Sequence, residues 1–143
     1  MSTITIRDML TEEAAQVAAL HEQIQTIHAN GRPDLFIAEY EDAMGLMLWH
    51  ASQEHKRVLV AEENGQLLGY AVIQYINRDA TPYTHARRLL HVEELCVDEN
   101  HRRSGAGRKL MNYITEDAKK RAYPRVELDV WDFNETARQF YEA

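Results

Sequence analysis

The sequence predicts a mixed α/β (α+β) layer architecture in which the elements follow the order β-α-α-β-β-β-α-β-α. Three observations predict it. Apolar residues first recur at helical spacing, then at the two-residue spacing of strands, and return to helical spacing after a glycine-rich turn. The 143 residues suit one domain, 1–143, which is long enough to bury a single core.

The first fifty residues are predicted to form one short strand and two helices. "TITIR" at Thr3–Arg7 alternates, as strands do. A helix then begins after the N-cap candidate Thr11 and ends at Gly31. Its apolar residues recur at three- and four-residue steps: Val17, Leu20, Ile24 and Ile27. Pro33 suits the first position of a second helix, which Gly45 would interrupt. One face of that helix would carry Phe36, Tyr40, Ala43 and Met47.

The middle of the chain is predicted to be three strands. "RVLVAEE" and "QLLGYAVIQYI" flank Asn64-Gly65, a pair that favours a type I′ hairpin turn. A polar loop around Pro82 follows, and "RLLHVEELCV" predicts the next strand.

The last third is predicted to be a helix, a strand and a final helix. The first of these helices follows the glycine turn, with apolar or small residues every four positions: Ala106, Leu110, Ile114, Ala118 and Ala122. Pro124 ends it, "RVELDVW" at Arg125–Trp131 predicts a strand, and Asn134 is an N-cap candidate for the final helix.

Composition excludes several classes of function. Acidic residues outnumber basic ones, 23 to 16, for a net charge of −7, the opposite of what a duplex nucleic-acid binder shows. No apolar run reaches the length of a membrane span, and the N-terminus lacks a signal peptide's apolar stretch. The single cysteine, Cys96, fits a reducing compartment. We expect a soluble, cytoplasmic protein with no nucleic-acid or membrane partner. His50 and His55 are poorly spaced as a metal pair, and no metal is expected.

One stretch, "NHRRSGAGRKL" at Asn100–Leu110, concentrates positive charge around two glycines where a helix should begin. Missing Cβ atoms let a ligand approach the backbone, and the first N–H groups of a helix have no intrahelical acceptor. Together with the helix dipole they form a site for phosphate, although an ordinary helix start beside a solvated basic run has the same pattern. The stretch matches neither the Walker loop nor the dinucleotide-binding fingerprint.

This stretch and the downstream "NETARQFYE" resemble the GNAT N-acetyltransferase superfamily. The acetyl-CoA motif of that family, Gln/Arg-x-x-Gly-x-Gly/Ala, is met by Arg102-Arg103-Ser104-Gly105-Ala106-Gly107, between the predicted fourth strand and third helix. The resemblance implies a mostly antiparallel, twisted sheet flanked by helices. It also implies direct transfer of an acetyl group from acetyl-CoA, as co-substrate, to a primary amine of a small molecule or peptide.

The resemblance also implies the residues that hold the cofactor. Backbone amides from Arg103 to Arg108 would cradle the pyrophosphate. Backbone groups of Leu95, Cys96 and Val97 would bond the pantetheine arm, where strands four and five splay apart, and the Cys96 thiol would have no nucleophilic role. Asn134 would touch the pantetheine, unless it is a plain N-cap.

Acyl transfer to an amine needs an acid and a base. By resemblance, Tyr141 is the acid that protonates the departing thiolate; otherwise it packs beside Phe140. Strand alternation puts His91, Glu93 and Leu95 on one face and Glu94 on the other. The resemblance implies a base at one of these two positions, or an acid on the fifth strand, and we rank Glu93 first, His91 second and Asp129 third.

The family pattern continues after Tyr141 with Gly-Phe and two further strands, whereas this sequence ends at Ala143. We expect these C-terminal strands to be missing by truncation or to be supplied by another subunit. Strand five would then present an open edge, and association through it, for example as a homodimer, is expected. The alternative to an enzyme is a non-catalytic module of the same fold that binds CoA or a protein partner.

Overall fold

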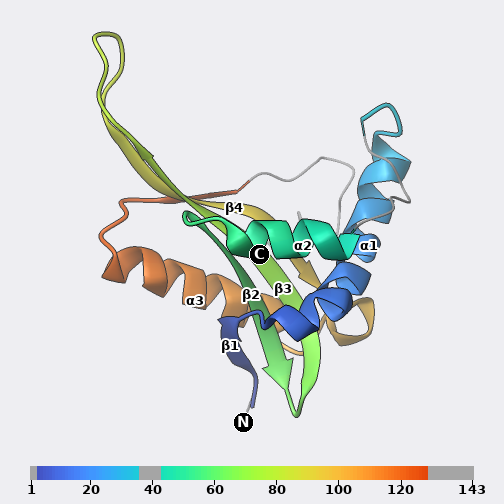
Figure 1. The fold of residues 1–143 in the computed structure, drawn as a ribbon. Coiled ribbons are helices and arrows are strands. Elements are labelled where there is room, and N and C mark those ends of the chain that lie inside the picture. Colours follow the sequence, from blue (N-terminus) through green and yellow to red (C-terminus); the bar gives the residue numbers. More distant parts are fainter. Residues whose placement is uncertain (1–2, 36–42, 129–143) are drawn as a thin grey trace.

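The computed structural model describes residues 3–35 and 43–128. Figure 1 shows the order of the elements. The strands are β1 (Thr5–Asp8), β2 (Lys56–Glu63), β3 (Gln66–Arg78), β4 (Arg87–Val97) and β5 (Val126–Leu128). The α-helices are α1 (Ala14–Gly31), α2 (Ala43–Ser52) and α3 (Ala106–Lys120), and the 3₁₀ turns are η1 (Thr11–Glu13) and η2 (Glu99–His101).

The described strands form one sheet in the order β1-β2-β3-β4-β5. Neighbours are antiparallel except β4 and β5, which are parallel. This confirms the predicted mixed, mostly antiparallel sheet. Parallel strands need a crossover connection, and α3 supplies it between β4 and β5.

The helices cover opposite faces of the sheet, each over its own apolar core. Val17 and Leu20 of α1 and Met47 of α2 pack with β2 and β3 residues such as Val60 and Tyr70 on one face. On the other face, α3 packs on the sheet through small and apolar residues at four-residue steps: Ala106, Leu110, Ile114 and Ala118. The four-residue period predicted for this helix is therefore confirmed from Ala106 to Ala118. Ala122 does not continue it, because α3 ends at Lys120 and Ala122 is exposed, with a φ of 59°.

The start of the first helix differs from the prediction. Thr11 lies in η1, and α1 begins three residues later at Ala14. The reason is Glu13, whose carboxylate accepts the backbone N–H of Leu10 at 2.8 Å and pairs with Arg7 at 2.7 Å. Glu13 thereby stabilises the entry to the helix in place of Thr11. The predicted end at Gly31 is confirmed.

The second helix also differs. Pro33 lies in a turn, and the described part of α2 continues through Gly45 without interruption. Phe36 and Tyr40 lie outside the described residues.

The predicted hairpin between β2 and β3 is confirmed. Asn64 and Gly65 have φ angles of 53° and 80°, the positive values that a type I′ turn requires at both central residues.

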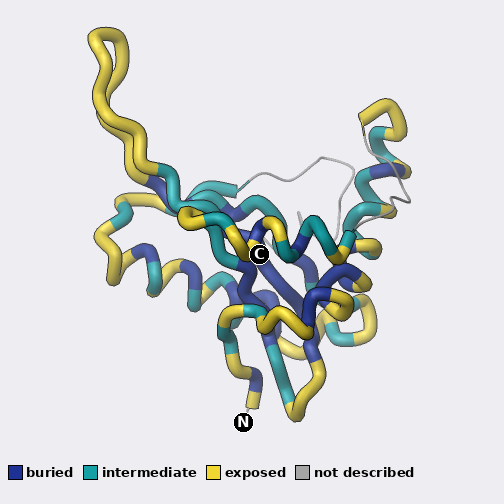
Figure 2. Tube along the Cα trace, viewed as in Figure 1, coloured by how far each residue is buried: buried dark blue, intermediate teal, exposed yellow. Residues whose placement is uncertain are grey.

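Strands β3 and β4 extend past the rest of the sheet as a long hairpin arm. Their pairing runs out to Arg78↔Arg87, whereas β2 begins only opposite Gln74. In Figure 1 the arm, yellow-green, projects away from the body, and Figure 2 shows that its outer part is exposed. Tyr83 near its tip is 94% exposed.

Candidate active site

The glycine turn between β4 and α3 leaves backbone donors open. Gly105, with φ +90°, is the left-handed N-cap of α3. The N–H of Ala106 donates to the Ser104 hydroxyl at 3.2 Å, and the first backbone bond into the helix runs from Lys109 N–H to Gly105 O at 3.0 Å. Within residues 3–35 and 43–128, the intervening amides have no acceptor. These are the amides of Gly107 and Arg108, at the positive end of the helix dipole.

Basic side chains surround this helix start. Arg102, Arg103 and Arg108 are all exposed. Lys109 is directed elsewhere, since its Nζ donates to the carbonyl of Ile4 at 3.3 Å. Open amides, a helix dipole and three guanidinium groups together form a site for a phosphate or diphosphate.

Before the glycine turn, the last residues of β4 have a hydrogen-bonded neighbour strand on one side only among the described residues. In the described part of the chain, pairing with β5 ends at Val92↔Leu128. Among the described residues, Glu94–Val97 are paired with β3 only. On the paired side the backbones are very close, because a Cβ added to Gly69 would lie 2.6 Å from the Cys96 carbonyl oxygen. Among residues 3–35 and 43–128, nothing pairs with the backbone edge of Glu94–Val97 that faces away from β3.

The Cys96 thiol is not in the reactive thiolate form. It is buried and donates to the carbonyl of Leu20 at 3.3 Å. Burial raises its pKa to about 12, so the thiol stays protonated near neutral pH.

A β-bulge in β4 changes which side chains share a face. Ile73 pairs with Val92 and Val72 pairs with Glu94, so Glu93 is an extra residue that has no opposite residue on β3. Leu95 packs against the core under α3, whereas Cys96 belongs to the core under α1 and α2. Glu94, two residues before Cys96, therefore lies on the α1/α2 face.

Glu93 lies on that face too, since it pairs with Lys56 beside α2. The predicted placements of Leu95 and Glu94 are therefore wrong. Leu95 does not share a face with Glu93, and Glu94 is not opposite to it. Regular alternation fails because the bulge inserts one residue between Val92 and Glu94.

Glu94 is held by buried hydrogen-bonding partners. Oε1 of Glu94 lies 2.5 Å from Nδ1 of His21 on α1 and accepts the Tyr70 hydroxyl at 2.9 Å. Oε2 lies 3.7 Å from Nε2 of His50 on α2. Burial alone would raise the pKa of Glu94, but hydrogen bonds from His21 and Tyr70 and the nearby His50 outweigh it and lower that pKa. Glu94 is thus a fixed anion.

Glu93 has a different set of partners. Its two oxygens lie 3.1 and 3.2 Å from Nζ of Lys56 on β2. Nδ1 of His50 lies 3.9 Å from Oε2 of Glu93 and 3.4 Å from the same Nζ. The Nζ also sits over the Trp49 ring, 4.8 Å from its centroid. Burial lowers the pKa of His50, so this imidazole is neutral at pH 7.

The other predicted catalytic residues are placed as follows. His91 is partly buried and pairs across the sheet with Gln74, which brings it to the α1/α2 face with Glu93. Asp129, Asn134 and Tyr141 lie outside the described residues.

Sequence reasoning missed Lys56 and the partners of both carboxylates. One weak signal was present, namely a lysine two residues before the apolar run Val58–Ala61 of β2. Nothing local in the sequence ties it to Glu93, 37 residues away.

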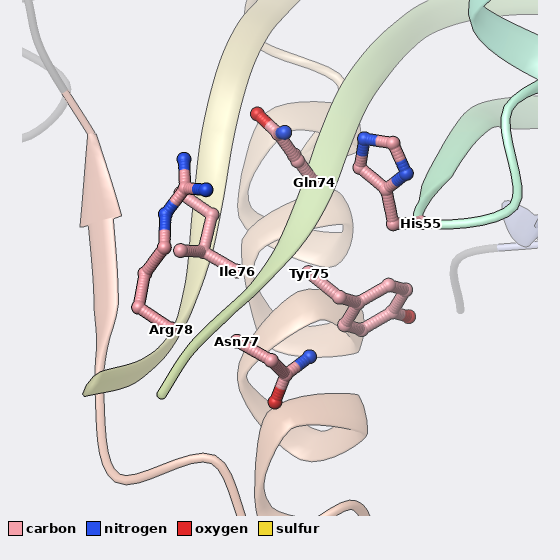
Figure 3. A pocket seen from close by; sticks show the side chains of 6 residues that line it. All are labelled: His55, Gln74, Tyr75, Ile76, Asn77 and Arg78. Atoms are coloured by element: carbon pink, nitrogen blue, oxygen red, sulfur yellow. The ribbon is translucent and has the colours of Figure 1, made fainter. Parts of the chain in front are cut away.

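A shallow pocket of about 360 Å³ lies beside this cluster, at the edge of β3 where β2 begins. Figure 3 shows the residues that line it: His55, Gln74, Tyr75, Ile76, Asn77 and Arg78. Gln74 pairs with both Lys56 and His91, so the pocket adjoins the Lys56–Glu93 pair. These six side chains include a cation and no carboxylate, so the pocket itself does not attract an ammonium group.

The described residues contain no cluster of three or more histidine, cysteine or acidic residues suited to a metal ion. None of the described helices is long and apolar enough to cross a membrane.

Comparison with solved structures gives similar folds over nearly the whole chain. The tetramutant of the BH1408 protein from Bacillus halodurans is 30% identical, with a TM-score of 0.88, over 96% of this chain and 90% of that chain. A ribosomal-protein-alanine N-acetyltransferase from Brucella melitensis biovar Abortus 2308 is 18% identical, with a TM-score of 0.74, over 97% and 88%.

The aminoglycoside acetyltransferase meta-AAC0020 from an uncultured soil metagenomic sample, in complex with sisomicin, is 18% identical. Its TM-score is 0.67, over 97% of this chain and 85% of that chain. At 18% identity these likenesses show the fold only. No curated protein matches the chain.

The family itself is identified by the model of the Acetyltransferase (GNAT) family, which matches residues 17–143. This match spans the bulged β4, the glycine turn and α3. It confirms the fold and the family that the glycine motif predicted. The chain belongs to the GNAT family of acetyltransferases.

Proposed function

We propose that this acetyltransferase moves an acetyl group directly from the thioester of acetyl-CoA to a primary amine of a small molecule or peptide. The observation that carries the proposal is the left-handed Gly105 cap, followed by the open amides of Gly107 and Arg108 among exposed arginines. A diphosphate is the ligand that this arrangement fits best, because it carries several negative charges and several hydrogen-bond acceptors.

Acetyl-CoA would lie along β4 with its pyrophosphate at the glycine turn. The residues proposed for the phosphate end are Arg102, Arg103, Ser104, Gly105, Ala106, Gly107 and Arg108. The pantetheine arm would bond backbone groups of Leu95, Cys96 and Val97, on the edge of β4 that faces away from β3. Asn134 would contact the same arm.

The thioester would then face the α1/α2 side of the sheet near Glu93. This carboxylate lies two residues before Leu95, about 7 Å along a strand. We propose Glu93 as the base that takes the proton of the acceptor, whose alkylammonium pKa is near 10. His91 on the same face is second, and Asp129 third. A positioned base contributes about 10²–10⁴-fold to the rate.

Tyr141 is the proposed acid for the departing thiolate, whose pKa is about 8.5 by analogy with cysteine. The Cys96 thiol takes no covalent part, because it is buried and its pKa is raised to about 12.

Two measurements test the cofactor and the reaction separately. Calorimetry with CoA and with pantetheine, which lacks the phosphates, should show much tighter binding of CoA, and Arg103→Gln should weaken CoA but not pantetheine. The absence of any binding of CoA at millimolar concentration would refute the proposal. Release of free thiol from acetyl-CoA with a panel of primary amines tests turnover.

Glu93→Gln and Tyr141→Phe should each lower kcat by at least about 100-fold with CoA affinity retained. Glu22→Gln, an exposed change on α1, is the matched control. Tight CoA binding with no turnover on any amine would identify a binding module instead.

A further inference from the structure

A side chain of the protein itself fills a ready-made site for an alkylammonium group. The site, here called the ammonium cage, consists of Trp49, His50 and Glu93. Nζ of Lys56 lies 3.1 Å from one oxygen of Glu93 and 3.2 Å from the other. It also lies 3.4 Å from Nδ1 of His50 and 4.8 Å from the centre of the Trp49 ring. A carboxylate, a neutral imidazole acceptor and an aromatic face are the three kinds of group that bind a primary ammonium.

The cage is not an ordinary surface ion pair. Only 10% of the Lys56 side chain is exposed, and the side chains of Glu93 and His50 are 20% and 8% exposed. Lysine side chains are rarely this buried unless they are paired. A neutral side chain would also fit this position of β2, so the strand itself does not explain the lysine. The cage is still reachable, because Trp49 at its rim is 52% exposed.

The occupant has the chemistry of the proposed acceptor. A primary amine substrate arrives as an alkylammonium ion, and Glu93 is the proposed base that removes its proton. The Lys56 ammonium occupies both oxygens of that carboxylate. We propose that the ammonium cage is the acceptor-amine subsite and that Lys56 is a tethered competitor, which every acceptor must displace before it can react. This inference rests on the proposed amine acetyltransferase function.

The tether sets the strength of the competition. Because Lys56 is attached to β2, its ammonium competes at an effective concentration on the order of millimolar or higher. Simple monoamines are therefore bound weakly by the native protein. Acceptors that make additional contacts, for example in the adjoining pocket at Gln74, are favoured over them.

The alternative is that Lys56 is a fixed clamp that orients Glu93. The competitor role and the clamp role predict opposite effects on the acceptor when the Lys56 ammonium is removed. A competitor blocks the acceptor, so its loss improves acceptor binding, whereas loss of a clamp weakens catalysis.

The direct test measures binding of butylammonium, a simple alkylammonium probe, by NMR titration in the absence of acetyl-CoA. Lys56→Met keeps most of the aliphatic stem and removes the ammonium. We expect butylammonium to bind this variant at least tenfold more tightly than the native protein. The double variant Lys56→Met/Glu93→Gln should lose that gain. Lys119→Met removes an exposed lysine elsewhere and should behave as the native protein does. Equal or weaker binding by Lys56→Met overturns the proposal.

Kinetics with butylamine as the acceptor provide the second readout. With saturating acetyl-CoA, Lys56→Met should raise kcat/KM by at least tenfold through a lower KM. A lower kcat without a lower KM identifies Lys56 as a clamp and overturns the proposal.

A measurement on the native protein covers the case in which Lys56→Met does not fold. The Cε resonance of Lys56, followed during a butylammonium titration, should move toward the position of exposed lysines as the side chain leaves the cage. No movement at saturating probe overturns the proposal. Neither NMR titration uses acetyl-CoA, so their failure is distinct from failure of the proposed function, which appears as absent CoA binding and absent thiol release.

Discussion

Two neighbouring carboxylates differ because their partners differ. Glu94 accepts from His21 and Tyr70 inside the protein, so it is fixed in place and stays ionised. Glu93 is paired with the largely buried ammonium of Lys56, and Nδ1 of His50 lies 3.9 Å from its Oε2. This difference is why Glu93, rather than Glu94, is the proposed base: its proposed role requires that Lys56 be displaced.

The lowered pKa of Glu94 predicts a specific pH dependence of stability. Its folded pKa lies below the usual 4.5, so its stabilisation is complete above that value and is lost as the pH falls through the folded pKa. Glu94→Gln should cost about 1.5–3 kcal/mol of unfolding free energy at pH 7. The difference from the native protein should shrink as the pH falls below 4.5. Urea unfolding from pH 7 to pH 3 measures it, with the exposed Glu22→Gln as the control. A difference that does not change with pH would contradict the assignment.

Gly69 is required by a close approach of two strands. A Cβ there would lie 2.6 Å from the Cys96 carbonyl oxygen and 3.2 Å from Val97 Cα, so backbone would have to move. Gly69→Ala should cost about 1–3 kcal/mol in denaturant unfolding. Gly65→Asn is the matched control, since Gly65 has open space around it and asparagine tolerates its φ of +80°. Equal effects of the two substitutions would show that the strands do not approach so closely.

At the scale of the element, the bulge in β4 decides the chemistry of the site. It brings two consecutive carboxylates to one face, where regular alternation would separate them. It does so without disturbing the flanking residues, because Val92 and Leu95 both still face α3.

Deletion of Glu93 should therefore leave the fold intact. Without it, Val92 and Glu94 become consecutive and keep their pairing with Ile73 and Val72. We expect cooperative unfolding and CoA binding to persist, while thiol release with amines falls by at least about 100-fold. Deletion of Leu95 is the control, because it transfers Cys96 to the opposite face and should destabilise the sheet. Unfolding of the Glu93 deletion variant would contradict the register described here.

At the scale of the whole molecule, the base of the hairpin arm is bonded to the body, for example by Asn77 to Tyr123, but its tip at residues 79–86 is separate. The two cores lie between the sheet and its helices, whereas the tip of the arm bonds mainly to itself. Thr81 N–H donates to Thr84 O at 2.9 Å, and Thr84 N–H donates to the Thr81 hydroxyl at 3.0 Å.

Replacing residues 79–86 by Asn-Gly should therefore change the unfolding free energy by no more than about 1 kcal/mol, since a shorter loop costs less to close. The new two-residue turn would join the paired Arg78 and Arg87. Thermal unfolding and CoA calorimetry measure the result. A loss of several kcal/mol would show that the tip of the arm packs on the body.

The sequence by itself predicted the order of the elements as far as β5, the Asn64-Gly65 turn and, through the glycine motif at Arg102–Gly107, the family. These features are local, because periodicity, turn residues and a helix start depend on neighbours along the chain. The predicted final helix lies outside the described residues. The entry to α1 was placed wrongly because Glu13 bonds both Leu10 and Arg7, and the second of these lies outside any helical pattern.

Only the tertiary structure decided which side chains of β4 lie together on the α1/α2 face of the sheet. The bulge at Glu93 depends on how β4 pairs with β3, and pairing register is a property of two strands rather than one. The Lys56 ammonium reaches Glu93 because β2, β3 and β4 are neighbours in the sheet and α2 lies over them. Such a meeting of distant residues leaves no local pattern in the chain, so the sequence predicted the glycine turn proposed to hold the cofactor but not the Lys56–Glu93 pair proposed for the acceptor.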